Sequence, residues 1–148
     1  MEKILTLEWK QAYEVGNFDI DAEHKIFLHI ILKIQRAYIQ KAPISYLEAL
    51  VSELIKYADF HFCSEENLMR AVDYPDLKNH QEVHKRLMFQ LNEEVNTVVF
   101  KYINFHTLIE FLYQWFLEHT TEEDKKLAVY IQNRDRINDD TCFDEDEY

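Results

Sequence analysis

Glycine and proline are almost absent from this chain: its 148 residues include one glycine and two prolines. Tight hairpins depend on these residues, so their scarcity favours long helices with short connections over a β architecture. Long apolar runs are also missing, because the longest, residues 26–34, is interrupted by His29 and Lys33 and is too short to span a bilayer. The two cysteines, Cys63 and Cys142, are too few for a disulfide framework. We therefore expect a soluble helical protein with reduced thiols.

Basic charge is scarce as well. The formal net charge of −12 disfavours nucleic acid and anionic membrane surfaces as partners. Residues 1–10 contain Glu2 and Glu8 and lack the apolar core of a signal peptide, so we expect a cytoplasmic protein. Six acidic residues fall within residues 139–148. We expect one domain over residues 1–136 and an acidic, disordered tail over residues 137–148.

Apolar residues recur at intervals of three and four in four separate stretches. The first begins near Phe18, after a loop that contains Gly16. The second follows Pro43, the third follows the break at Pro75, and the fourth begins after a weak polar break near Asn104. Helices of about 20–30 residues with short connections predict an all-α fold, an antiparallel up-down-up-down four-helix bundle with an N-terminal loop.

Five of the seven histidines lie on these apolar stripes together with two carboxylates. They form four groups: His24 alone, His61 with Glu65, His80 with His84, and His119 with Asp124. Burying so many polar side chains in one core costs several kcal/mol unless something binds them. Imidazoles with a few carboxylates suit a pair of borderline transition metals better than calcium or magnesium. One spaced histidine pair is weak support for a metal site, but such groups on four successive helices predict a shared one.

The neighbours of these residues are expected to matter less. Cys63 projects away from the face of His61 and Glu65, so we expect it to pack rather than to bind metal. Glu66 is turned about 100° off the buried face, so its replacement should damage metal retention less than replacement of Glu65. The remaining histidines are expected to be ordinary residues: His29 and His106.

Several short motifs carry a family resemblance. They are Trp9-x3-Tyr13-x-Val15-Gly16, Ile20-Asp21-Ala22-Glu23-His24-Lys25, His61-Phe62-x2-Glu65-Glu66-x-Leu68-Met69, His80-x3-His84 and Trp115-x3-His119-x4-Asp124. On these motifs the chain resembles the hemerythrins, most of all the single-domain prokaryotic kind (bacteriohemerythrins), over about residues 7 to 131. Ferritin-like di-iron proteins instead use paired Glu-x-x-His motifs, and this sequence contains none.

The resemblance implies a four-helix bundle that holds two iron ions joined by an oxo or hydroxo bridge. It implies that one iron is bound by three histidines, the other by two, and that two carboxylates bridge them: His80, His84 and His119; His24 and His61; Glu65 and Asp124. The two-histidine iron then has one open position, where the resemblance implies that O2 binds reversibly and is held as hydroperoxide.

The expected wall of the O2 pocket consists of Phe27, Phe62, Trp115, Phe116 and Thr120. Two of these differ from the usual family pattern, in which Leu and Ile are common at the positions of Phe116 and Thr120. We expect Phe116 to narrow the pocket, and the hydroxyl of Thr120 to admit water or a proton.

Storage or delivery of O2 is the function that the resemblance favours, without enzymatic activity. The alternatives are a sensor of O2 or nitric oxide and a di-iron enzyme acting on peroxide or nitric oxide. No redox-partner module supports the enzyme, and no fused signalling domain supports the sensor. The acidic tail is the only candidate handle for a protein partner, which the sequence does not identify.

Overall fold

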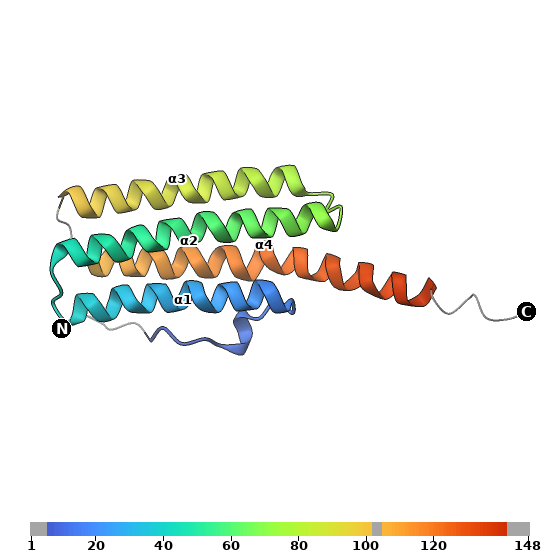
Figure 1. Ribbon diagram of the computed structural model, residues 1–148, viewed down its shortest axis with the longest axis horizontal. Coiled ribbons are helices and arrows are strands. Elements are labelled where there is room, and N and C mark those ends of the chain that lie inside the picture. Colours follow the sequence, from blue (N-terminus) through green and yellow to red (C-terminus); the bar gives the residue numbers. More distant parts are fainter. Residues whose placement is uncertain (1–5, 102–104, 142–148) are drawn as a thin grey trace, which may run out of the picture.

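The computed structural model describes residues 6–101 and 105–141, and within them it contains four long helices and no strand. The helices are α1 (Phe18–Ile39), α2 (Ile44–Ala71), α3 (Leu77–Lys101) and α4 (Phe105–Thr141), preceded by a short 3-10 turn, η1 (Gln11–Tyr13). They lie side by side in alternating directions, which confirms the predicted all-α bundle (Figure 1). The break expected near Asn104 falls outside the described residues. No helix of the described chain combines the length and apolarity needed to cross a lipid bilayer.

The start of α1 is fixed by local hydrogen bonds. Asn17 caps the helix, because its side chain accepts a hydrogen bond from the backbone N–H of Ile20 at 3.1 Å. Asp21 in the first turn accepts from the backbone N–H of Val15 at 2.9 Å and of Gly16 at 3.2 Å. Gly16 has φ +94°, and a Cβ atom there would lie 2.6 Å from Nε2 of Gln132. The single glycine therefore permits both the turn into α1 and the close approach of the N-terminal segment to α4.

The first two helices end with the same geometry. Lys41, after α1, and Asp73, after α2, adopt left-handed φ angles of 56° and 53°. The following backbone N–H groups reach back over the helix ends, from Ala42 to the carbonyl of Ala37 and from Tyr74 to the carbonyl of Met69. These tight ends make the connections short, so that consecutive helices become antiparallel neighbours.

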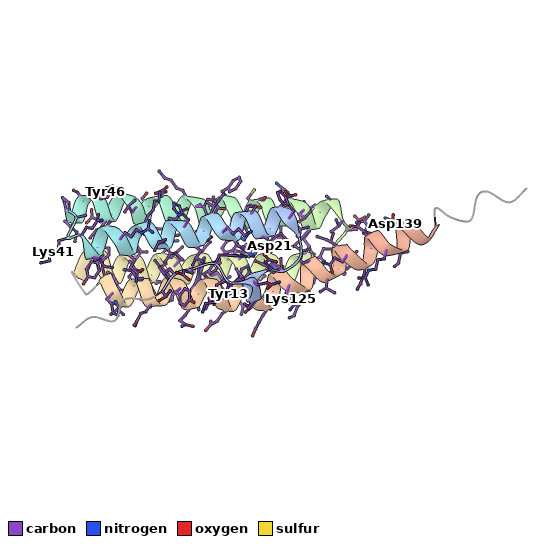
Figure 2. All side chains as sticks on the ribbon, turned by 90° about the horizontal axis from the view of Figure 1, so that it is seen from below. Tyr13, Asp21, Lys41, Tyr46, Lys125 and Asp139 are labelled. Atoms are coloured by element: carbon purple, nitrogen blue, oxygen red, sulfur yellow. The ribbon has the colours of Figure 1, made fainter. Side chains whose placement is uncertain are left out.

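The fourth helix is longer than the sequence suggested. α4 runs to Thr141 and projects past the other helices at one end of the bundle (Figures 1 and 2). Residues 137–141, which we expected to begin a disordered tail, are therefore helical; no glycine or proline interrupts α4. Tyr130 anchors the emerging helix by donating to the carbonyls of Val72 and Asp73, both at 3.1 Å. Residues 142–148 lie outside the described part of the chain.

Two apolar clusters fill the bundle, with a polar layer between them. The larger joins all four helices toward the α1–α2 connection and includes fully buried Ile31, Leu54 and Leu112. The smaller, near the α2–α3 connection, is built around Val15, Ile20, Met69, Leu127 and Ala128. The buried histidines and carboxylates occupy the level between these clusters. The fold thus keeps a compact set of polar groups away from water on both sides.

Candidate metal centre

All seven side chains singled out as candidate metal ligands are buried, none of them more than 5 % exposed. α1 supplies His24, α2 supplies His61 and Glu65, α3 supplies His80 and His84, and α4 supplies His119 and Asp124. The antiparallel arrangement brings the start of α1, the end of α2, the start of α3 and the middle of α4 to one level. The described structure thus brings the whole predicted set together.

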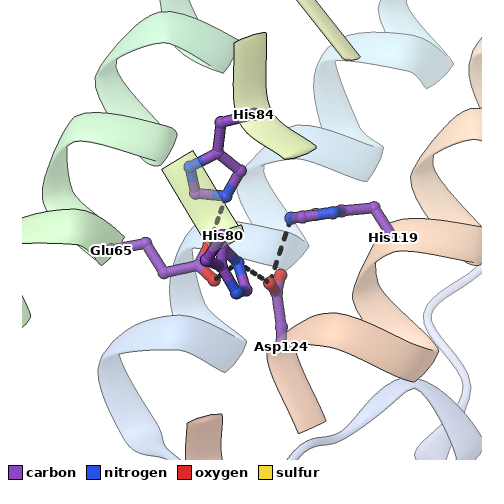
Figure 3. A group of neighbouring side chains, drawn as sticks. All are labelled: Glu65, His80, His84, His119 and Asp124. Carbon is purple, nitrogen blue, oxygen red and sulfur yellow. Dashed lines mark ion pairs between the residues drawn. The ribbon is translucent and has the colours of Figure 1, made fainter. Parts of the chain in front are cut away.

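Figure 3 shows the two carboxylates, Glu65 and Asp124, directed toward the histidines of α3 and α4. Asp124 presents Oδ2 to Nε2 of His24 at 2.8 Å and Oδ1 to Nε2 of His119 at 3.0 Å. Glu65 presents Oε2 to Nε2 of His61 at 3.1 Å and Oε1 to Nε2 of His80 at 3.2 Å. Each carboxylate therefore contacts two different histidines, one through each of its oxygens, as a bridging ligand must.

The ligand atoms fall into two compact sets, in each of which all atoms lie within 4.8 Å of one another. One set contains three histidines and the other two, and both contain Glu65 and Asp124. The three-histidine set is His80, His84 and His119; the two-histidine set is His24 and His61. A cation in the second set would have one protein ligand fewer, so it would keep a position free for a small molecule.

Unpaired polar atoms show how well this layer suits a metal ion. Both carboxylate oxygens of Glu65, Oδ1 of Asp124 and Nε2 of four of the histidines are buried without a hydrogen-bond partner in the described chain. Leaving such atoms unpaired costs about 1–3 kcal/mol each. The donor set, imidazole nitrogens with shared carboxylates, fits iron and similar transition metals. The residues present therefore fit the group that the motifs imply.

The pKa values of the histidines in the layer are shifted in opposite directions. Burial lowers the pKa of His61, but the surrounding carboxylates Asp124, Glu23 and Glu65 outweigh it and hold that pKa well above its ordinary value. The same competition raises the pKa of His80 to about 9, whereas burial and the neighbouring imidazoles lower the pKa of His84 to about 2. Burial raises the pKa of Asp124, but the histidines around it hold the value well below the usual range. Without metal, protons bind some of these nitrogens, and a bound metal would displace them.

Two further carboxylates, which we did not place at the site from the sequence, reach the outer nitrogens of the histidines. Oε1 of Glu23 lies 3.5 Å from Nδ1 of His61, and Ser64 donates to the other oxygen of Glu23 at 3.2 Å. Oε1 of Glu66 lies 3.5 Å from Nδ1 of His84. One histidine of each set thus has an outer carboxylate, the usual arrangement for orienting a metal-binding imidazole. Glu66 is therefore closer to the site than its helical position suggested.

A small aromatic cavity adjoins the two-histidine set. It is lined by the five residues expected to form the pocket, together with three of the histidines: Phe27, Phe62, Trp115, Phe116 and Thr120; His24, His61 and His119. About 10 Å³ is available to the centre of a water-sized molecule. A single water needs ~10–15 Å³ measured in this way, so the cavity suits one very small molecule.

The hydroxyl and indole groups of this wall form hydrogen bonds to backbone carbonyls. The hydroxyl of Thr120 donates to the carbonyl of Phe116 at 2.8 Å, and the indole N–H of Trp115 donates to the carbonyl of Leu87 at 3.2 Å. The ring of Phe116 stacks on that of Phe27, with centroids 5.6 Å apart. The non-histidine lining is therefore apolar in character. The hydroxyl of Thr120, which we expected to admit water or a proton, donates its own proton to a backbone carbonyl.

The remaining residues discussed from the sequence lie outside the layer. His29 and His106 belong to neither ligand set, and His106 pairs instead with Glu110 at 3.1 Å. Cys63 is exposed rather than packed, so that expectation was wrong. Its position about 160–200° from the ligand face points it toward solvent between α2 and α3.

A comparison with families of known proteins agrees with this geometry. Residues 15–131 match the hemerythrin HHE cation binding domain, a range that includes every residue of both ligand sets. The chain belongs to the hemerythrin family. This confirms the resemblance drawn from the motifs, and the matched range spans the whole buried layer.

Individual relatives of this hemerythrin come from bacteria and from a eukaryote. The chain is 26 % identical over 127 residues to a bacteriohemerythrin of Campylobacter jejuni, covering 84 % of this chain and 95 % of that protein. It is 28 % identical over 128 residues to a bacteriohemerythrin of Clostridium acetobutylicum, covering 80 % and 95 %. A hemerythrin-like protein of Naegleria gruberi is 26 % identical over 118 residues, covering 80 % and 87 %. The similarity thus extends over nearly the whole length of each relative.

Proposed function

We propose that this protein binds O2 reversibly at a centre of two iron ions, for storage or delivery. The observation that carries the proposal is the unequal pair of ligand sets, which share Glu65 and Asp124 and differ by one histidine. The aromatic cavity is lined by both histidines of the smaller set, where a bound cation would have a free coordination position. The iron pair, when bound, supplies the electrons that make O2 binding strong and reversible.

In this function the chain's own residues would have three roles: binding the irons, orienting the imidazoles and excluding water. The seven buried side chains hold the two irons, with Glu65 and Asp124 as bridges. Glu23 and Glu66 orient the imidazoles of His61 and His84 through their outer nitrogens. The aromatic wall excludes bulk water, which keeps protons away from the bound gas.

The wall also favours binding over chemistry. An enzyme that cleaves the O–O bond needs a proton donor beside it. The two donors on the non-histidine wall, the hydroxyl of Thr120 and the indole of Trp115, are hydrogen-bonded to backbone carbonyls. We therefore propose a binding protein without enzymatic activity. Its cytoplasmic location stays a prediction.

Anaerobic reconstitution tests this function. The metal-free chain is loaded with Fe(II), its iron content is measured, and the visible spectrum is recorded before and after air is admitted and then removed. We expect about two irons per chain and an absorption band that appears with O2 and disappears on its removal. One zinc per chain with no iron uptake, or a spectrum that changes once and does not return, contradicts the proposal.

A further inference from the structure

A surface groove between α2 and α3 also reaches the ligand layer, because two of its lining residues are Phe62 and His84. It has a volume of about 360 Å³, and its lining from α2 includes Asp59, Cys63 and Glu66. The ring of Phe62 lines both the groove and the cavity, and it stacks on the ring of His84 with centroids 4.1 Å apart. Phe62 thus separates the groove, which is lined by carboxylates and a thiol, from the aromatic cavity.

The groove ends at a buried histidine. His84 lines it and is 3 % exposed, and its Nδ1 has no hydrogen-bond partner in the described chain. The nearest charged atom is Oε1 of Glu66 at 3.5 Å. Glu66 is partly open to solvent, whereas Glu65, the next residue in α2, is buried in the ligand layer. These two adjacent carboxylates connect the groove with the layer.

The α2 side of the groove offers a series of cation ligands. Asp59, Cys63 and Glu66 lie four and three residues apart, so they follow one stripe of the helix over ~10 Å. Carboxylates and a thiol are ligands that ferrous iron accepts. They do not form a compact set within 4.8 Å among the described residues, so the groove is suited to passing a cation on rather than to retaining it. Lys85, the lysine in the lining, pairs with Glu82 at 3.2 Å.

The aromatic cavity is unsuitable for the passage of a cation. Apart from the site histidines its wall is hydrocarbon with backbone-bonded polar groups, and it has room for about one water. A divalent cation in such surroundings loses its hydration without replacement, which costs tens of kcal/mol in the limiting case. A neutral gas has no such penalty.

We propose that this groove is the port through which ferrous iron enters the buried site, with Asp59 and Cys63 at its mouth and Glu66 at its inner end. The inference rests on the proposed di-iron centre and adds a route to it. Gas and metal then reach the same layer by two separate openings, both of which are lined by Phe62.

The test is the rate of iron uptake by the full-length, metal-free protein under anaerobic conditions. Samples mixed with Fe(II) are quenched at intervals with a strong ferrous chelator, and the iron retained by the protein is measured. The variants are Glu66→Gln and the double change Asp59→Asn with Cys63→Ser. The double change removes two groove ligands and leaves the residues of the ligand layer and their partners unaltered. Glu48→Gln, an exposed acid on the same helix, is the matched control for charge.

We expect Glu66→Gln to slow uptake about tenfold and the double variant several-fold, while Glu48→Gln stays within about twofold of the parent, because charges lining a cleft accelerate cation capture by 10-fold or more. The final iron content should remain near that of the parent in the double variant. Uptake at the parental rate in the double variant and in Glu66→Gln overturns the port. Loss of final iron in Glu66→Gln without a slower rate also overturns it, since Glu66 then only orients His84. If the parent takes up no iron, the port fails together with the di-iron centre.

Discussion

Replacing Thr120 tests whether the aromatic cavity is the O2 site. Thr120→Ile exchanges the hydroxyl for a two-carbon branch, whereas Thr120→Val exchanges it for a methyl group of similar size. The side chain is 3 % exposed and lines the cavity, and its hydroxyl already donates to the carbonyl of Phe116. Valine therefore changes the hydroxyl alone, and isoleucine also adds volume.

The magnitude follows from the size of the cavity. Only about 10 Å³ is open to the centre of a water-sized molecule, so one added carbon occupies the space that O2 would use. Forcing ligand and side chain together costs about 1–3 kcal/mol, and each 1.4 kcal/mol is tenfold in affinity. We expect the Kd for O2 of Thr120→Ile to rise between about fivefold and a hundredfold.

Thr120→Val should differ little from the parent. The lost hydrogen bond contributes about 1 kcal/mol at most, and the carbonyl of Phe116 keeps its position in the α4 hydrogen-bond ladder. We expect the melting temperature to change by no more than about 4 °C. The lifetime of the oxygenated protein should stay within about fivefold, because ~1 kcal/mol corresponds to about fivefold. From the sequence alone, removal of the hydroxyl would be expected to lengthen that lifetime.

Stopped-flow O2 association, equilibrium O2 titration and decay of the oxygenated absorption band measure these effects. A Kd in Thr120→Ile equal to that of the parent refutes the assignment of the cavity. A many-fold change of lifetime in Thr120→Val would mean that the hydroxyl acts in the pocket despite its bond to the backbone.

Four other predictions concern the layer and the ends of the chain. Glu65→Ala should reduce the iron content from about two per chain to less than one, as measured by metal analysis, because both irons lose a bridge. Glu23→Gln should weaken iron retention about 10- to 100-fold in a chelator competition, with the fold intact by circular dichroism, because the outer partner of one imidazole loses its charge. Deletion of residues 137–148 should leave iron content unchanged and the melting temperature within about 3 °C, since the described part of this segment projects from the bundle. Burial and a hydrogen bond raise the pKa of Tyr13 to about 12. Above pH 10 the folded protein therefore keeps a proton that the unfolded chain loses. The free energy of unfolding should fall between pH 10 and 12, and it should fall less in Tyr13→Phe.

Each of these has a specific counter-result. Iron content in Glu65→Ala equal to that of the parent would exclude a bridging role. Equal iron retention in Glu23→Gln and in Glu53→Gln, an exposed control, would reduce Glu23 to a surface residue. A large loss of melting temperature after the deletion would show that the C-terminal segment docks on the bundle. An identical alkaline unfolding profile in Tyr13→Phe would contradict the proton assignment.

The sequence allowed the ligand layer to be predicted because a helix has one period. Each candidate ligand falls on the apolar stripe of its own helix, and the stripe becomes the buried face. The short connections decide the antiparallel order, which then brings distant positions such as His24 and Asp124 to 2.8 Å. Spacing within one helix was sufficient for this part.

The outer partners could not be found in the same way, because their contacts cross between helices. Glu23 of α1 reaches His61 of α2, and Glu66 of α2 reaches His84 of α3. Each of these acids sits beside a ligand in the sequence and about 100° away from it around the helix. Only the rotation of each helix relative to its neighbour decides whether such a side chain faces solvent or the next histidine. The length of α4 was missed for another reason: an exposed helical extension has no apolar stripe to reveal it.

The polar layer between two apolar clusters leads us to expect two cooperative units of unequal size in the bundle. Without metal, the layer that separates the smaller cluster, around Ile20, Met69 and Leu127, from the larger one contains buried groups that lack hydrogen-bond partners. Amide hydrogen exchange in that end of the metal-free chain should then proceed by local opening, at a lower free energy than global unfolding. A cation that ties all four helices together at this level would merge the two units, so that the protected core extends to the α2–α3 connection.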